Sequence, residues 1–120
     1  MSKDNPIMDF LQAICDAEGI NLHSYPFKHK DGVAIRDGDW RFIGYKDTLE
    51  GWPLVSLIAH ELGHHLLGHL DDGKLALGKD GQNYYQNRVM REKREHEART
   101  FAAAFTAMAV YDYYKGAVSV

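Results

Sequence analysis

The sequence predicts one α+β domain over residues 1–120, with elements in the order helix, small antiparallel sheet, helix, loop, helix. Two observations carry this prediction. Apolar residues recur at helical spacing near both ends of the chain, and Asp-Gly pairs separate short β-type runs in between. A chain of 120 residues has room for a single modest hydrophobic core.

The first third of the chain reads as a helix followed by strands. Apolar residues at helical spacing predict a helix over about 7–17, and Gly19 follows as a stop. The next segment, "INLHSYPFKHKDGVAIRDGDWRFIGYKD", contains the turn signals "KDG" and "RDGD". Two or three antiparallel strands are therefore expected, two of them at roughly 32–35 and 40–45.

A second helix is expected from about Trp52 to Leu67, with Asp47 or Thr48 as a cap and Pro53 in the first turn. Residues 71–87 hold three glycines among polar residues and are expected to form a loop. A long last helix is expected over about 87–114, closed by Gly116.

Composition and charge narrow the classes of function. The formal net charge is −3, so nucleic acid is not an expected partner. Cys15 is the only cysteine, which excludes an internal disulfide. The N-terminus lacks a signal-peptide core, and the most apolar run, "FAAAFTAMAVY", is too short to span a bilayer. We therefore expect a cytoplasmic protein with no membrane partner.

The stretch "AHELGHHLLGH" holds four of the seven histidines and contains an H-E-x-x-H motif at residues 60–64. Histidines at positions i and i+4 of a helix project about 40° apart, so His60 and His64 can reach one metal ion. Glu61 lies beside this pair, where it could take a proton from a water molecule that zinc has acidified. The alternative is a surface helix that carries the pattern by chance.

The same helix has an apolar stripe opposite the two histidines. It is formed by Val55, Ile58, Ala59, Leu62 and Leu66. One face of the helix is thus expected to pack on the core, and the other to face a cleft.

Two further histidines in this stretch, His65 and His69, are expected to serve in packing or capping. His69 is a poor candidate for the third ligand. The extended metzincin motif places a glycine three residues, and a histidine six residues, after the second histidine. Here Gly68 and His69 stand at four and five.

A catalytic zinc ion typically has three protein ligands, and the last helix offers the third candidate. On a helical wheel Glu97 shares a stripe with apolar residues, and a carboxylate on a core face is costly unless a cation meets it. Its stripe neighbours are Ala98, Phe101, Ala104, Phe105 and Met108, whereas Glu92, Glu95 and His96 fall outside. The predicted zinc ligands are therefore His60, His64 and Glu97. The alternatives are an ion pair of Glu97 with Arg94 and weaker ligands at His69, Asp71 or Asp72.

These motifs resemble those of the ImmA/IrrE-type metallopeptidases of bacteria and their mobile elements. The resemblance rests on "AHELGHHLLGH", on "EARTFAAAF" and on "DGVAIRDGDWRFIGY". It implies a small zincin-like, gluzincin-like fold with a short sheet over the active-site helix. It also implies His60, His64 and Glu97 as zinc ligands, and Glu61 as general base. The sequence "FTAMAV" replaces the two leucines, methionine and proline that often end the family's last motif.

The resemblance further implies cleavage or inactivation of a helix-turn-helix transcriptional repressor, often one that silences phage or conjugative-element genes. A substrate peptide is expected to add as a strand beside residues 40–45. Tyr84, Tyr85, His96 and Tyr111 are open candidates for the oxyanion donor. Two other functions stay open: a non-hydrolytic antirepressor that contains zinc and acts by binding, and a toxin or housekeeping peptidase with another substrate.

Overall fold

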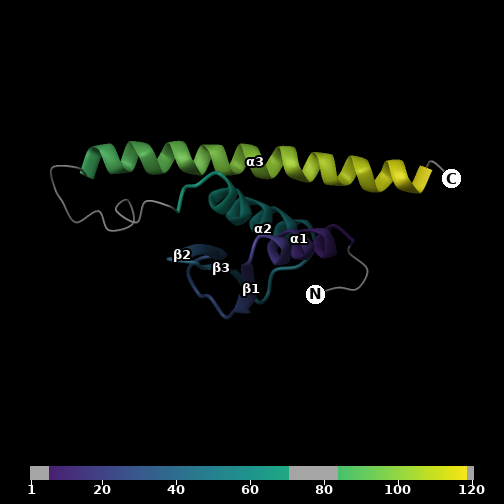
Figure 1. Cartoon of the computed structure of the whole chain (residues 1–120), viewed down its shortest axis with the longest axis horizontal. Helices are drawn as coiled ribbons and strands as arrows, with labels where there is room; N and C mark the ends of the chain where they lie inside the picture. Colours follow the sequence, from purple (N-terminus) through teal and green to yellow (C-terminus); the bar gives the residue numbers. More distant parts are fainter. Residues whose placement is uncertain (1–5, 71–83, 119–120) are drawn as a thin grey trace.

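The computed structural model describes residues 6–70 and 84–118, with side chains over 7–70 and 88–111. It confirms the α+β class, with a small sheet and a long C-terminal helix (Figure 1). The elements are α1 (Pro6–Ala17), β1 (Ile20–Tyr25), β2 (Gly32–Asp37), β3 (Trp40–Lys46), α2 (Gly51–Leu66) and α3 (Tyr84–Val118).

Helix α1 covers one side of the core. Pro6 stands at its first position, where the missing N–H costs nothing. Met8, Leu11 and Cys15 recur at helical spacing and are fully buried. The chain leaves the helix through Gly19, whose φ of 71° is accessible to glycine with little strain.

The sheet is mixed, which corrects the expectation of antiparallel strands alone. Strands β2 and β3 form the expected antiparallel hairpin across a two-residue turn that begins at Gly38, with φ of 60°. Strand β1, however, pairs parallel with β3, and the order is β1-β3-β2. Each connection reverses the chain direction, so β3 runs parallel to β1 once it has inserted between β1 and β2.

Helix α2 lies in the middle of the molecule, between the sheet and α3 (Figure 1). The bounds of this helix agree with the sequence to within one residue. The N-cap residue differs from the expected one. It is Glu50, whose side chain makes no capping hydrogen bond. The roles of Asp47 and Thr48 as caps are therefore wrong. The apolar side chains Val55, Ile58, Ala59 and Leu62 are buried as expected, whereas Leu66 is exposed.

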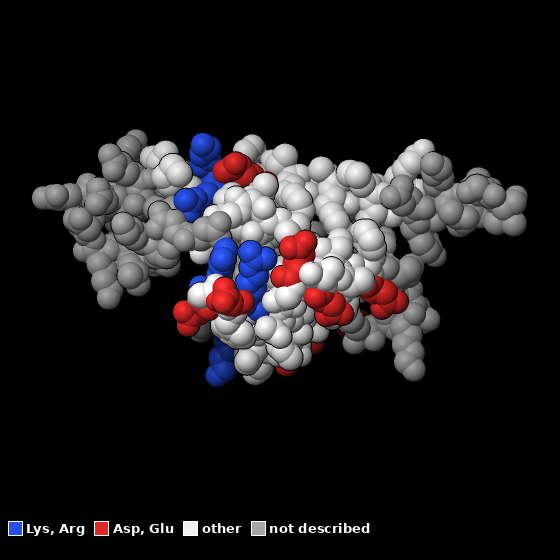
Figure 2. All heavy atoms as spheres, in the orientation of Figure 1, with Lys and Arg blue, Asp and Glu red and all other residues white. Residues whose placement is uncertain are grey.

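Helix α3 runs past the expected end and continues through Gly116 to Val118 (Figure 1). Its buried contacts with the core come from the small residues Ala98, Ala102 and Ala109. The expected loop over 71–87 lies mostly outside the described residues, although its last four residues are helical. In the described part of the chain, no helix combines the length with the apolarity that a membrane span requires. On the face in Figure 2, described acidic and basic side chains lie next to one another.

Candidate metal centre

The second half of α2 presents His60 and His64 on one side of the helix, one turn apart. Their ring centroids lie 4.8 Å apart, and their Nε2 atoms approach to 3.2 Å. His64 is buried, with 8% of its surface exposed, and His60 is partly buried. The two imidazole nitrogens that could hold a metal thus point at the same place, as the motif predicted.

A carboxylate from α3 completes this group, and it belongs to Glu95. Its Oε2 lies 2.9 Å from His60 Nε2, and its Oε1 lies 3.0 Å from His64 Nε2. Donor atoms of these three residues all lie within 4.8 Å of one another. Bonds of 2.0–2.2 Å to a tetrahedral zinc ion separate its donors by roughly 3.3 Å. Two imidazoles and one carboxylate therefore fit a zinc ion in both chemistry and spacing.

Glu97, the expected third ligand, does not lie with the two histidines. Its side chain is 45% exposed, and its Oε1 is 3.5 Å from Nε2 of His69. The expectation that Glu97 lies on the buried face of the last helix is therefore wrong. Its alternative partner Arg94 is also engaged elsewhere, because its Nη1 donates to the carbonyl oxygen of His69 at 2.9 Å.

The predicted buried face of α3 was wrong because large side chains do not mark the part of α3 that packs most closely on α2. The face of α3 that packs on α2 is marked by alanines: Ala98 and Ala102 are buried, whereas Ala104 and Met108 are exposed. Glu95 stands three residues before Ala98 and seven before Ala102, so it lies on that alanine face. The spacing of alanines in "EHEARTFAAAF" was the signal that could have identified Glu95.

Burial sets the protonation of the groups around this centre. It raises the pKa of Glu61 to about 7, with a further increase from the Glu95 carboxylate and an opposing effect of Lys30. Burial lowers the pKa of His64 to about 4, against the attraction of Glu95. At neutral pH His64 is thus uncharged in the metal-free chain, which is the form that ligates a metal. Glu61 is poised to exchange a proton near pH 7.

A family model described as the IrrE N-terminal-like domain, a peptidase family, matches residues 15–106. This match spans more than half of the chain. The chain belongs to the IrrE N-terminal-like family. Neither the curated proteins nor the solved structures include a significant match to the chain. Membership confirms the resemblance identified in the sequence and places the chain in a peptidase family.

The two remaining histidines of the family's motif segment have separate surroundings. His65 Nε2 lies 3.0 Å from the carbonyl oxygen of Phe42, so this ring joins α2 to the sheet as a packing residue. His69 lies just beyond α2, and its Nδ1 is 2.9 Å from Nδ1 of His64. The sequence indicated packing or capping for both, but the contact between His69 and the candidate ligand could not be read from spacing alone.

The turn after α2 explains how His69 reaches His64. Gly68 adopts φ of 73°, and its N–H donates to the carbonyl oxygen of His65 at 3.3 Å. The N–H of His69 donates to the carbonyl oxygen of His64 at 3.0 Å. These two bonds form a Schellman motif, in which the residue after the glycine folds back over the last turn of the helix.

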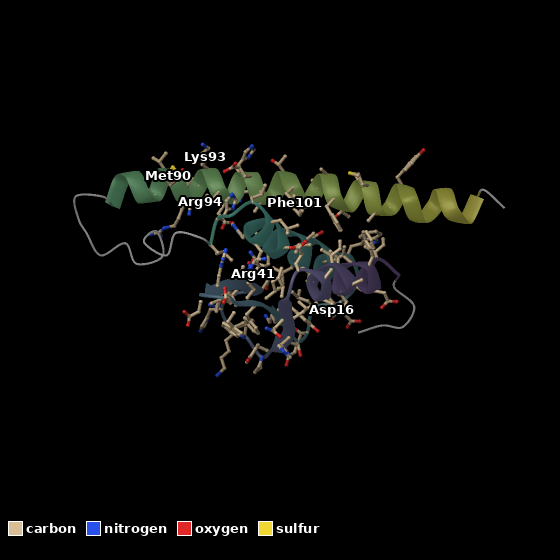
Figure 3. The ribbon with its side chains drawn as sticks, viewed as in Figure 1. Asp16, Arg41, Met90, Lys93, Arg94 and Phe101 are labelled. Atoms are coloured by element: carbon tan, nitrogen blue, oxygen red, sulfur yellow. The ribbon has the colours of Figure 1, made fainter. Side chains whose placement is uncertain are left out.

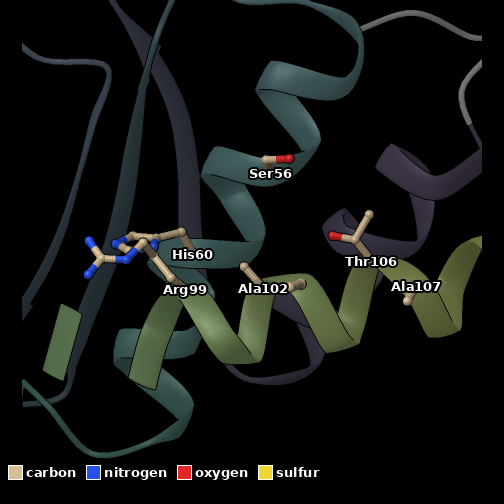
Figure 4. Close-up of a pocket in the computed structure, with 7 residues that line it drawn as sticks. Ser56, His60, Arg99, Ala102, Thr106 and Ala107 are labelled. Atoms are coloured by element: carbon tan, nitrogen blue, oxygen red, sulfur yellow. The ribbon is translucent and has the colours of Figure 1, made fainter. Parts of the chain in front are cut away.

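A groove of about 520 Å³ opens beside His60, between α2 and α3 (Figure 4). His60 and Arg99 lie at one end, and Thr106 and Ala107 lie toward the other. Small side chains form most of its wall: Ser56, Ala102, Ala103, Thr106 and Ala107. Figure 3 shows Arg94 and Phe101 on the side of α3 that faces the rest of the domain.

Several other expectations from the sequence have different outcomes. Asp71 and Asp72 lie outside the described residues, as do the side chains of Tyr84 and Tyr85. His96 and Tyr111 are exposed on α3. The expected peptide site beside 40–45 is wrong, because β3 is the central strand and is paired on both sides. An added strand requires an edge, and β2, which packs near α2, is one.

Proposed function

We propose that this chain is a zinc-dependent endopeptidase that cleaves a helix-turn-helix transcriptional repressor of the phage or mobile-element type. The proposal is carried by one observation: Nε2 of His60, Nε2 of His64 and the carboxylate of Glu95 converge from two helices, with buried Glu61 next to them. Family membership supports peptide hydrolysis as the reaction class. The repressor as substrate follows from the resemblance to ImmA/IrrE-type peptidases.

Each residue has a distinct part in this proposal. His60, His64 and Glu95 hold the ion, and a zinc ion in such a site acts as a Lewis acid that acidifies water and polarises a carbonyl group. Glu61 would accept a proton from the attacking water and return it to the leaving amine, and in the metal-free chain burial already raises its pKa to about 7. We place the substrate backbone along the free edge of β2 and one of its side chains in the groove beside His60.

The variant Glu61→Gln separates hydrolysis from binding. The amide keeps the size of the side chain but cannot accept the proton, so we expect unchanged zinc content and a loss of cleavage of at least about a hundredfold. Zinc is measured by elemental analysis of purified protein. Cleavage is measured by sequencing new protein N-termini in bacterial cells that express either form.

The identity of the new N-termini tests the substrate. We expect termini within helix-turn-helix regulators in cells with the wild-type chain, and none in cells with Glu61→Gln. New N-termini in other proteins alone would support peptidase activity and contradict the prediction that a repressor is the substrate. If Glu61→Gln relieves repression as well as the wild type, the chain is a binding antirepressor and the peptidase proposal fails.

A further inference from the structure

We propose that His69 and Glu97 position the metal ligand His64. In this arrangement a chain of hydrogen bonds runs from Nδ1 of His64 through the His69 ring to the Glu97 carboxylate. The inference rests on the proposed function only in requiring that His60, His64 and Glu95 bind zinc. It gives a role to two residues that would not bind the ion themselves.

Four contacts carry the inference. Nδ1 of His64 and Nδ1 of His69 are 2.9 Å apart, and the other nitrogen of His69, Nε2, lies 3.5 Å from Glu97 Oε1. Nε2 of His64, on the far side of that ring, is the atom that faces Glu95 and His60. His64 and His69 are both about nine-tenths buried, so few water molecules compete for their nitrogens.

The contacts fix the tautomer of both rings. To bind a metal, Nε2 of His64 must present its lone pair, which leaves the proton of the neutral ring on Nδ1. This N–H can donate only if Nδ1 of His69 is an acceptor. His69 must then carry its own proton on Nε2, where the carboxylate of Glu97 is the acceptor. A lone pair on Nε2 of His64 for the metal therefore determines the direction of each hydrogen bond from His64 to Glu97.

The backbone holds His69 in place for this task. Gly68 turns the chain so that the N–H of His69 donates to His64, and Arg94 donates to the carbonyl oxygen of His69 from α3. His69 is thus held by α2 on one side and by α3 on the other. Metal-bound histidines generally donate their second ring N–H to such a partner, which orients the ring and makes it a better ligand.

Two nearly isosteric variants of His69 distinguish positioning from packing. Asparagine places an oxygen acceptor where Nδ1 of His69 stands, whereas leucine places a methyl group there. We expect His69→Leu to weaken zinc binding about 10- to 100-fold, and His69→Asn to stay within about tenfold of the wild type. Zinc affinity is measured by competition with a chromophoric chelator. Equal affinities of the two variants would overturn the inference.

Glu97 provides an independent test that does not depend on a buried position. Because it is half exposed, Glu97→Ala should fold, and we expect it to weaken zinc binding about tenfold. Glu92→Ala is the matched control, since Glu92 lies on the same helix and, within the described residues, pairs with Arg88 away from the histidines. A loss as complete as that in His64→Ala would make Glu97 a direct ligand and overturn the inference, as would an affinity equal to that of Glu92→Ala.

Nuclear magnetic resonance reports the tautomers directly. In the zinc-loaded chain labelled with ¹⁵N-histidine, we expect His64 to carry its proton on Nδ1 and His69 on Nε2. A proton on Nδ1 of His69 would overturn the inference. Wild-type protein that binds no zinc would end both proposals. Zinc binding without any cleavage would end the proposed function alone.

Discussion

Burial assigns different properties to the two carboxylates beside the histidines. Glu61 is 8% exposed and has a pKa raised to about 7, whereas the side chain of Glu95 is 48% exposed. The buried group is suited to exchanging a proton near neutral pH. The exposed group leaves the histidine pair open to solvent, from which an ion and a substrate can enter. Two acids 34 residues apart in the sequence are thus matched to different tasks by their surroundings alone.

The single cysteine should make the protein sensitive to alkaline pH. Burial raises the pKa of Cys15 from 9.0 to about 11, with a smaller contribution from Asp16. The unfolded chain therefore loses the thiol proton at lower pH than the folded chain does. The stabilisation is fully present below about pH 9 and is lost as the pH rises through about 11.

We expect the free energy of unfolding to fall by roughly 2–3 kcal/mol more in the wild type than in Cys15→Ala over this range. Urea titrations at several pH values measure the difference, and the variant corrects for tyrosine and lysine groups that titrate in the same range. Parallel pH profiles of the two proteins would contradict the prediction.

At the scale of elements, the close packing of α2 on α3 brings the third donor to the histidines. Gly63 lies between His60 and His64 in the region where α3 crosses, and a methyl group on it would come within 2.9 Å of Cδ1 of Phe101. Ala98 is the other close neighbour, with its Cα 3.4 Å from that point. A glycine opposite an alanine lets the two backbones approach closely enough for Glu95 to reach both rings.

We therefore expect Gly63→Ala to destabilise the fold by about 1–2 kcal/mol. The collision with Phe101 costs about 1–3 kcal/mol, and the better helix propensity of alanine returns at most about 1 kcal/mol. The free energy of unfolding is measured in the presence of a chelator, so that metal binding does not contribute. Phe101→Leu in the same chain should recover part of the loss. If Gly63→Ala alone is as stable as the wild type, Phe101 moves away without cost and the prediction is wrong.

The groove beside His60 offers a second test at this scale. Ala103 lines the groove and is exposed, so Ala103→Trp should fill part of it without unfolding the chain. We expect cleavage to fall at least about tenfold while zinc content stays unchanged, because the substrate side chain is displaced. Ala104→Trp is the matched control, since Ala104 is also exposed on α3 but does not line the groove. Equal activities of the two variants would place the substrate elsewhere.

For the molecule as a whole, the proposed ion would act as a cross-link between layers. In the fold, α2 packs on the sheet, on α1 and on α3, while α3 touches the remainder mainly through α2 (Figure 1). Of the candidate ligands, His60 and His64 come from α2 and Glu95 from α3. A bound ion would hold the long helix to the rest of the domain at this point.

Removal of zinc should therefore lower the thermal stability of the chain. At free zinc 100- to 1,000-fold above its dissociation constant, binding adds about 2.7–4.1 kcal/mol to the folded state. We expect a chelator to lower the Tm by more than about 5 °C in the wild type. The same chelator should change the Tm of the variant His64→Ala very little. Differential scanning calorimetry measures the Tm, and an identical Tm with and without chelator would contradict a structural contribution of the ion.

The sequence alone determined most of the elements and two of the three donors of the candidate metal centre. Amphipathic periodicity located α1 and α2, the Asp-Gly turn located the β2–β3 hairpin, and the spacing of His60 and His64 placed both rings on one side of a helix. These features depend on residues near one another in the chain, so local rules of geometry suffice for them.

Only the tertiary structure decided the rest. The insertion of β3 between β1 and β2, the choice of Glu95 over Glu97 and the contact of His69 with His64 all depend on how separate elements approach one another. A rotation of α3 by a fraction of a turn exchanges one glutamate for the other at the histidines. That rotation is set by the alanines and Gly63 at the crossing of two helices, where close approach favours small side chains over large apolar ones.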